Sequence, residues 1–597
     1  MCGIFFAYTS NPQLFSDVST DIIKDSMSHR GPDGFECIRP NSNSIIAHSR
    51  LAIRGLSNGN QPFYDNNIFT VVNGEVYNYK SLPVRYDHTL GDCYSLHSLI
   101  TTCDINAFWK YLPHVEGMFA WVTYFQAQNL VFVATDTFGQ KPVYYYYKDD
   151  LFICASEISI IKSFLAQLDL YLEVNAPDYS NYILHGWMAA EATGWKHISY
   201  LKRGFCMYID LYNFSFKIND YKNNYSCANI ANKEEAYEFL VYNSDHYSLS
   251  AFDSEVNFTL GLSSGLDSSY LAKLAKEYFD SQFIALSLGY DRDTENDESI
   301  AAQNFCIANN ISHSSFVANS SNFIYEYLKT ISLVQEPIAD FAAQFYSNIY
   351  TCARSQIGCK VIVMGHGADE LSIGYGWMFG ALNHYRTSNL FSLYETNSDF
   401  RYYYTRMQYV SSLTRDFYSF SAPSAFLTSD SYFANSLISI VCDTWLQNSS
   451  LKLADRLSMS QSVECRSPLL NERIYHHLSQ LFQYIPESLD LQKGLFKKIF
   501  SSRLGEDQLL SKKKYFEPPR AHFYSLLYSF FSRQIKSDNS IAESFGILRN
   551  GVFDHLFSQA SNAELYYWLN KLLKLELSLI STLDPLRFRK LLELSLK

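Results

Sequence analysis

The sequence predicts two folded regions of different class, an α+β region followed by an α/β region. Residues 1 to about 215 contain short apolar and aromatic runs separated by turns, which is typical of layered antiparallel sheets. Beyond about residue 236, strand-length apolar runs alternate with helical patterns, which favours a parallel sheet covered by helices. From about residue 385 onward the pattern is mainly helical.

The composition supports this prediction and narrows the function. Of the 597 residues, 47% are apolar and 18% are charged, which excludes a mostly disordered chain. The net charge of −12 argues against a nucleic-acid-binding protein. No apolar run approaches the ~18 residues of a membrane helix, and the first residues lack the pattern of a secretory signal. We therefore expect a cytoplasmic protein whose 12 cysteines are mostly buried and reduced.

The expected elements follow from the runs themselves. Strands of the first region are expected within residues 43–53, 67–78, 118–125, 129–147 and 151–157. The polar, Asn-rich segment 216–235 is the expected linker, which places the two domains at residues 2–215 and 236–597. In the second domain, strands are expected at residues 255–262, 282–290 and 359–365, and helices at 234–243 and 270–279.

Cys2 directly follows the initiator methionine, and removal of that methionine would leave a cysteine with a free α-amine. An α-amine, with a pKa near ~8, can serve as general base for its own thiol, which activates an N-terminal nucleophile. A cysteine at this position can also be accidental. The neighbouring motifs therefore decide whether Cys2 is interpreted as a nucleophile.

Six motifs follow in order through the first domain. They are MCGIF (1–5), MSHRGPDG (27–34), HSRLAIRGLSNGNQP (48–62), NGEVYN (73–78), GDCYSL (91–96) and DTFGQKPVYY (136–145). This series resembles class II glutamine amidotransferases, and specifically the glutaminase domain of asparagine synthetases. The resemblance implies an N-terminal nucleophile hydrolase-like β-sandwich layered with helices, in which the Cys2 thiolate attacks the amide of glutamine.

The resemblance also assigns roles around Cys2. It implies that Arg50 clamps the α-carboxylate of glutamine and that Asp92 and Glu75 hold its α-ammonium. The Asn73 side chain and the Gly74 N–H would form the oxyanion hole. Taken alone, Asn-Gly is the strongest short hairpin signal, and a turn could also present such a hole. Arg50 and Asp92 alone would be surface charges.

The segment EVNFTLGLSSGLDSSY (255–270) predicts a strand, a Ser/Gly loop and a helix start. Exposed N–H groups at such a place attract anions, although a generic Ser/Gly loop is weak evidence. SSGLDSS resembles the SGGLDSS pyrophosphate loop of enzymes that adenylate a carboxylate with ATP, with Ser264 in place of the usual glycine. A positive φ at this position would strain a serine.

Further motifs extend the resemblance to about residue 520. They are KVIVMGHGADELSIGYG (360–376), DRLSMSQSVECRSPLL (455–470), QKGLFKKIF (492–500) and SKKKYFEPP (511–519). The resemblance implies an ATP-pyrophosphatase domain that binds Mg²⁺ through Asp267 and Asp369, since hard cations choose carboxylates and phosphates. Its implied ATP and pyrophosphate ligands are Gly261, Ser263, Ser264, Gly265, Asp267, Ser268, Ser269, Leu288, Met364, Gly365, Lys493 and Lys513. Seen alone, Asp369 would be a structural loop acid and residues 512–514 a solvated charge run.

Three positions depart from the family pattern. His366 stands where an acid is usual, Met364 where serine is usual, and Gly261 where a leucine-like residue is usual. We expect Gly261 to enlarge the adenine pocket. His366 could act as a base near neutral pH, but a histidine does not reproduce a fixed negative charge that contacts a substrate ammonium. His366 therefore weakens the case for aspartate as the acceptor.

These observations predict a two-site enzyme. Cys2 would release ammonia from glutamine, and the second domain would adenylate a carboxylate, by default L-aspartate, to give an amide, AMP and pyrophosphate. The alternatives are an amidotransferase for a sugar acid or biosynthetic intermediate, an ATP-dependent lactam-forming cyclase, and a scaffold that binds without turnover. The resemblance further implies small-molecule substrates only, with ATP and Mg²⁺ as cofactors, and a possible homodimer.

Overall fold

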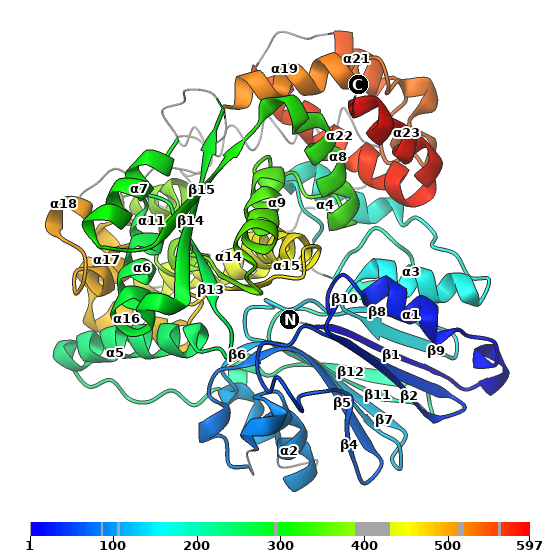
Figure 1. Ribbon diagram of the computed structural model, residues 1–597, viewed down its shortest axis with the longest axis horizontal. Helices are drawn as coiled ribbons and strands as arrows, with labels where there is room; N and C mark the ends of the chain where they lie inside the picture. Colours follow the sequence, from blue (N-terminus) through cyan, green and yellow to red (C-terminus); the bar gives the residue numbers. More distant parts are fainter. Residues whose placement is uncertain are drawn as a thin grey trace.

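The computed structural model describes residues 2–84, 87–103, 108–189, 191–291, 297–387, 430–509, 519–558 and 563–596. Three sheets organise these residues. In Figure 1 the two antiparallel sheets, in blue and cyan, lie below the parallel sheet, and the orange and red C-terminal helices lie at the top.

Two six-stranded antiparallel sheets form the N-terminal sandwich. The first has the order β10 (Ile198–Tyr200), β8 (Tyr144–Lys148), β9 (Leu151–Ala155), β1 (Gly3–Thr9), β3 (Ser44–Arg50) and β2 (Gly34–Asn41). The second has the order β12 (Ser215–Asp220), β11 (Phe205–Asp210), β7 (Leu130–Thr135), β6 (Gly117–Phe125), β5 (Ile68–Val76) and β4 (Phe63–Asp65).

The central strand β1 is buried on both faces, which explains its uninterrupted apolar sequence. Ile4 and Phe6 belong to the core between the two sheets, whereas Phe5 and Ala7 pack on the side of α1 (Thr20–Met27) and α3 (Ile158–Gln167). Helix α2 (Tyr94–Thr102) packs on the other face of the second sheet. The resulting helix–sheet–sheet–helix layers confirm the predicted α+β class.

The third sheet confirms the predicted α/β region. Its five strands are parallel, in the order β15 (His313–Ala318), β14 (Phe283–Tyr290), β13 (Phe258–Gly261), β16 (Val361–Val363) and β17 (Glu464–Arg466). One face packs on α5 (Lys233–Phe252), α6 (Leu266–Phe279), α7 (Ser299–Ala308), α16 (Glu472–Tyr484) and α17 (Gly494–Phe500). The other packs on α8 (Phe323–Val334), α9 (Ala343–Cys352) and α15 (Lys452–Met459).

The C-terminal part is helical, as predicted. It comprises α19 (Arg520–Phe531), α20 (Ile541–Ser544), α21 (Val552–Ser558), α22 (Ala563–Leu583) and α23 (Pro585–Ser595). Helix α22 reaches the N-terminal region, because Lys571 Nζ donates to Ile183 O at 3.1 Å, at the end of α4 (Tyr179–His185). One apolar core therefore runs from the outer face of β1 through α8 to these helices.

Two further observations bear on the sequence predictions. None of the helices in the described ranges has the length and apolar character needed to cross a bilayer. All twelve cysteines are unpaired, and nine of them are buried. The expected linker, residues 216–235, includes most of β12 and the first turn of α5, and the domain boundaries stay a prediction.

Candidate active site

The first site is built around Cys2, which immediately precedes β1 and is 9% exposed. Its backbone is held from both sides, since Cys2 N donates to Asn73 Oδ1 at 2.9 Å and Cys2 O accepts from Arg30 Nε at 3.1 Å. Burial raises the pKa of the Cys2 thiol. The thiol therefore needs a base at close range, and the α-amine of a trimmed Cys2 would be such a base.

Asn73 and Gly74 lie inside β5, paired with Ala120 and Phe119 of β6, so the hairpin interpretation is wrong. Gly74 has φ +150°, and a Cβ there would lie 1.9 Å from Met118 O, so only glycine fits. Asn73 Nδ2 is buried and has no hydrogen-bond partner in the described part of the chain. The amide that orients Cys2 therefore also offers a preorganised donor for developing negative charge.

Arg50 and Asp92 are buried beside Cys2 and are not surface charges. Arg50, at the end of β3, donates to Gly55 O at 2.6 Å and to Asn60 Oδ1 at 2.9 Å. Asp92 Oδ2 accepts from Val76 N at 2.6 Å. Both side chains are therefore held by backbone and loop atoms at the rim of the same cavity.

Glu75 is bridged by two arginines, Arg54 at 2.9 Å and Arg466 at 2.9 Å. Arg466 belongs to β17 of the C-terminal region, where its Nε also binds Glu464 at 2.6 Å. Glu464 lines the cavity beside Cys2. The C-terminal region therefore completes the first site. The sequence shows that the segment 455–470 contains Glu464 and Arg466, but nothing in it indicates that Arg466 reaches Glu75.

The structure brings most of the predicted glutamine-site residues together around one cavity of about 30 Å³, and Asn73 holds the Cys2 nitrogen without being part of the lining. Its lining includes Cys2, Arg50, Gly74, Glu75 and Asp92. The space beside the thiol is therefore small in this conformation.

The second site lies at the carboxyl edge of the parallel sheet, where ligands of such folds bind. β13 ends at Gly261, and α6 begins at Leu266 after a short loop. A cavity of about 400 Å³ opens there. Its lining includes these predicted residues: Gly261, Ser263, Asp267, Ser268, Leu288, Met364, Gly365, His366 and Asp369. Ser264, Gly265, Ser269 and Lys493 are not part of the lining, and Lys513 lies outside the described residues.

The loop before α6 is held by its own serines. Ser263 N donates to Ser268 Oγ at 3.1 Å, and Gly265 N donates to Ser263 Oγ at 3.0 Å. Ser264 Oγ donates to Glu298 Oε1 at 2.6 Å, and Ser264 is not among the residues with positive φ. The serine that replaces the usual glycine is therefore accommodated without backbone strain.

Asp267 and Asp369 meet at one cation, because Lys493 Nζ lies 2.5 Å from Asp267 Oδ2 and 3.2 Å from Asp369 Oδ2. Burial would lower the pKa of Lys493, but the two carboxylates raise it above its ordinary value. Two converging carboxylates are a donor set that suits Mg²⁺ when phosphate oxygens supply the other ligands. Among the described residues, no cluster of three or more His, Cys, Asp or Glu suits a metal.

His366 faces the same cavity, and no described residue forms an ion pair with it. Its Nδ1 lies 3.4 Å from Ser450 Oγ, and its Nε2 is buried and unpartnered within the described ranges. Burial lowers the pKa of His366 to about 4, so the ring is neutral at pH 7.

Gly261 and Met364 fit each other. A Cβ at position 261 would lie 2.3 Å from Met364 Sδ. The expectation that Gly261 enlarges the adenine pocket is therefore wrong, because the Met364 side chain occupies that space.

Comparison with known proteins finds two protein families in this chain. Residues 1–222 match the glutamine amidotransferase domain family, and residues 250–582 match the asparagine synthase family. The glutamine-hydrolyzing asparagine synthetase 3 of Bacillus subtilis (strain 168) is 23% identical over 96% of each chain. Synthetase 1 of the same organism is 24% identical over 88% of each chain. A probable glutamine-hydrolyzing asparagine synthetase of Acanthamoeba polyphaga mimivirus is 25% identical over 64% of this chain and 69% of its own.

Proposed function

Since the chain belongs to the asparagine synthase family, an ATP-using family of carbon–nitrogen ligases, we propose how its two sites divide one reaction. Cys2 releases ammonia from glutamine, and the C-terminal region couples that ammonia to a carboxylate activated with ATP. The observation that carries this proposal is Asn73 Nδ2 beside Cys2, which none of the described residues engages in a hydrogen bond.

In the first step the Cys2 thiolate attacks the amide carbon of glutamine, with the α-amine of trimmed Cys2 accepting the thiol proton. Asn73 Nδ2 and the Gly74 N–H stabilise the tetrahedral oxyanion. Its collapse breaks the C–N bond, the nitrogen takes up a proton and ammonia leaves. Water then hydrolyses the γ-glutamyl thioester to glutamate. Arg50 binds the α-carboxylate of the substrate, and Asp92 and Glu75 face its α-ammonium.

In the second step the loop Gly261–Gly265 and the start of α6 cradle the phosphates of ATP. Asp267 and Asp369 would hold Mg²⁺, which when bound neutralises phosphate charge. A carboxylate oxygen of the acceptor attacks the α-phosphorus and pyrophosphate leaves, and Lys493 and Lys513 are proposed to neutralise its charge. Ammonia then attacks the acyl-adenylate carbon, AMP leaves and the nitrogen loses a proton, which gives the amide.

The proposed route between the sites rests on a short chain of contacts that links residues of the two cavities. Glu464 lines the Cys2 cavity, and its neighbour Cys465 has its Sγ 3.8 Å from the hydroxyl of Tyr350. Tyr350 lines the nucleotide cavity. We propose that ammonia passes along this part of β17, because it must remain unprotonated until it reaches the acyl-adenylate.

The acceptor is proposed as L-aspartate, with a specialised acceptor as the second candidate. His366 favours the second candidate, because its neutral ring supplies no negative charge to an acceptor ammonium. A sugar acid or another hydroxylated carboxylate would instead accept or donate a hydrogen bond at Nε2. The complete glutaminase set counts against a lactam-forming cyclase.

The deciding experiment incubates the purified, Met-trimmed protein with glutamine, Mg·ATP and L-aspartate. Asparagine and pyrophosphate are quantified by mass spectrometry and a coupled assay. Formation of asparagine in step with pyrophosphate identifies aspartate as the acceptor. Glutamate release without asparagine or pyrophosphate excludes aspartate and retains the first step. A homodimer is proposed as well, and light scattering tests it.

A further inference from the structure

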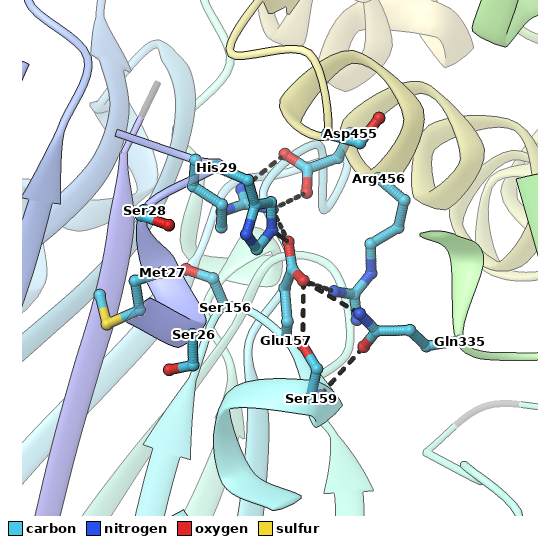
Figure 2. Close-up of polar contacts among 12 residues, drawn as sticks. Ser26, Met27, Ser28, His29, Ser156, Glu157, Ser159, Gln335, Asp455 and Arg456 are labelled. Carbon is cyan, nitrogen blue, oxygen red and sulfur yellow. Dashed lines mark hydrogen bonds and ion pairs between the residues drawn. The ribbon is translucent and has the colours of Figure 1, made fainter. Parts of the chain in front are cut away.

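A buried cluster of two guanidinium and two carboxylate groups joins the two regions of the chain. Arg30 Nη1 lies 2.7 Å from Glu157 Oε1, and Arg456 Nη1 lies 3.0 Å from Glu157 Oε2. Arg30 also pairs with Asp455 through both of its terminal nitrogens, at 3.0 and 3.1 Å. Figure 2 shows Glu157 among His29, Ser159, Gln335 and Arg456, with Asp455 nearby.

The charges of this cluster balance. Each of the four side chains is at most 2% exposed. Burial would raise the pKa of Glu157, but His29 and the two arginines hold it well below its usual range. Removing one partner from such a buried group leaves an uncompensated charge, so the cluster keeps one geometry.

Arg30 extends the cluster to the nucleophile. Its third nitrogen, Nε, donates to Cys2 O at 3.1 Å. One planar fork therefore connects Cys2, Glu157 and Asp455 through four donated hydrogen bonds. Asn73 holds the Cys2 nitrogen and Arg30 holds the Cys2 carbonyl oxygen. The two hydrogen bonds together fix the Cys2 backbone and hence the direction of its side chain.

Asp455 leads to the other site. It lies on α15, where Leu453 and Ala454 line the nucleotide cavity and Lys452 Nζ binds Glu336 Oε1 at 3.0 Å. One turn of α15 therefore carries both the residues that line the nucleotide cavity and the carboxylate that binds Arg30. A displacement of α15 therefore reaches Cys2 through two side chains.

We propose that Arg30 is a positioning residue for Cys2. We also propose that, through Asp455, the orientation of Arg30 depends on whether the nucleotide cavity is occupied. Occupation of the nucleotide cavity shifts α15, and the Asp455–Arg30 pair carries this shift to the Cys2 backbone. The inference rests on the proposed function, since it assigns a regulator to the same thiol.

The first test is Asp455→Asn, which keeps the shape but removes the charge that Arg30 meets. We expect the kcat of glutamate release to fall about tenfold or more, with the KM for glutamine within about threefold, because the thiol is misdirected and the substrate site is kept. The affinity for Mg·ATP, measured by calorimetry, stays within about threefold. A raised KM at unchanged kcat overturns the proposal.

The matched control is Asp443→Asn. Asp443 Oδ1 binds Arg203 Nε at 2.7 Å, so this pair also crosses between the two regions, but it does not reach Cys2. We expect both kinetic parameters of this variant to equal those of the wild type. A loss of kcat equal to that of Asp455→Asn overturns the proposal, because any cross-region pair would then have the same effect.

The second test reads Cys2 without turnover. Iodoacetamide alkylation is followed by mass spectrometry of the N-terminal peptide, with and without Mg·ATP. We expect the nucleotide to change the alkylation rate about threefold or more in the wild type and in Asp443→Asn, and to have no effect in Asp455→Asn. The proposal is overturned if Mg·ATP does not change the alkylation rate of the wild type. It is also overturned if Mg·ATP changes the alkylation rate of Asp455→Asn as much as that of the wild type. Failure to release glutamate, by contrast, counts against the proposed function alone.

Arg30→Lys decides the case if Asp455→Asn does not fold. The lysine keeps the positive charge but lacks the planar fork that spans three partners. We expect the same loss of kcat and of nucleotide response, in a protein whose thermal midpoint and Mg·ATP affinity show that it is folded. Unchanged kcat in this variant overturns the proposal.

Discussion

The two cavities differ in how their walls are built. The cavity beside Cys2 has a volume of about 30 Å³ and is bounded mainly by loop residues, with the ends of β3, β5 and β17 and ion pairs from both regions. The cavity at the parallel sheet has a volume of about 400 Å³ and is bounded largely by helices, among them α6, α9 and α15, together with strand ends and the loops that follow them. A single reactive thiol needs fixed neighbours, whereas a nucleotide together with an acceptor needs an open cleft. The sites should therefore respond differently to substitution.

The largest effect is expected for Cys2→Ala, which separates the two sites completely. Glutamate release from glutamine should fall by about a thousandfold or more, because the nucleophile is lost. Turnover with added ammonia should remain, since the nucleotide cavity is untouched. The assay measures glutamate and pyrophosphate in parallel. The exposed thiol variant Cys227→Ala is the control and should keep both activities. Loss of both activities in Cys2→Ala would contradict the two-site division.

The second largest effect is expected for Asp267→Asn, which removes one of the two carboxylates at Lys493. Pyrophosphate release should fall by about a hundredfold or more even with ammonia supplied, because the proposed metal site loses a charged ligand. Glutamate release should persist. Asp280→Asn, at the exposed far end of α6, is the control. Retained pyrophosphate release in Asp267→Asn would place the metal elsewhere.

The third prediction concerns the fit of Gly261 and Met364. Gly261→Leu alone should weaken Mg·ATP binding about tenfold, because the new side chain meets the Met364 sulfur. The double variant Gly261→Leu/Met364→Ser should recover binding to within about threefold, since the serine vacates the space. Titration calorimetry of the two single variants and the double variant measures the coupling. Additive effects would show that the two residues are independent.

The smallest effect concerns pH. The folded-state pKa of His366, about 4, lies below its unfolded value of about 6.5, so between these two pH values the unfolded chain binds one more proton than the folded chain. The free energy of unfolding should therefore fall as the pH falls from about 6.5 to 4. Above about pH 6.5, neutral His366 should cost the folded protein no stability. His366→Gln should make the loss between pH 7 and 5 smaller by at most about 2 kcal/mol. Chemical denaturation at both pH values measures this, and an unchanged slope would show that His366 does not contribute.

Much of the candidate site follows from local sequence. The motifs around Cys2, Arg50, Gly74 and Asp92 predict one site, and the structure assembles these four residues around one cavity. Alternation of strand and helix predicts the parallel sheet and places SSGLDSS at its carboxyl edge. Such features are predictable because a loop, a turn or an amphipathic pattern is set by residues that are close in the chain.

Local rules fail where another segment supplies the deciding contact. Asn73 and Gly74 form the commonest hairpin signal, but the ladder with β6 keeps them in a strand. Gly261 predicts extra space in the adenine pocket, but the Met364 side chain, from the end of the neighbouring strand, fills that space.

The sequence by itself therefore determined the family, the two regions and most of the residues that gather at each site. The tertiary structure alone decided that Arg466 reaches Glu75, that Asp455 holds Arg30 and that one core joins the sandwich to the C-terminal helices. Pairings between distant segments depend on how whole layers pack, and charged side chains carry no local signal for their partner.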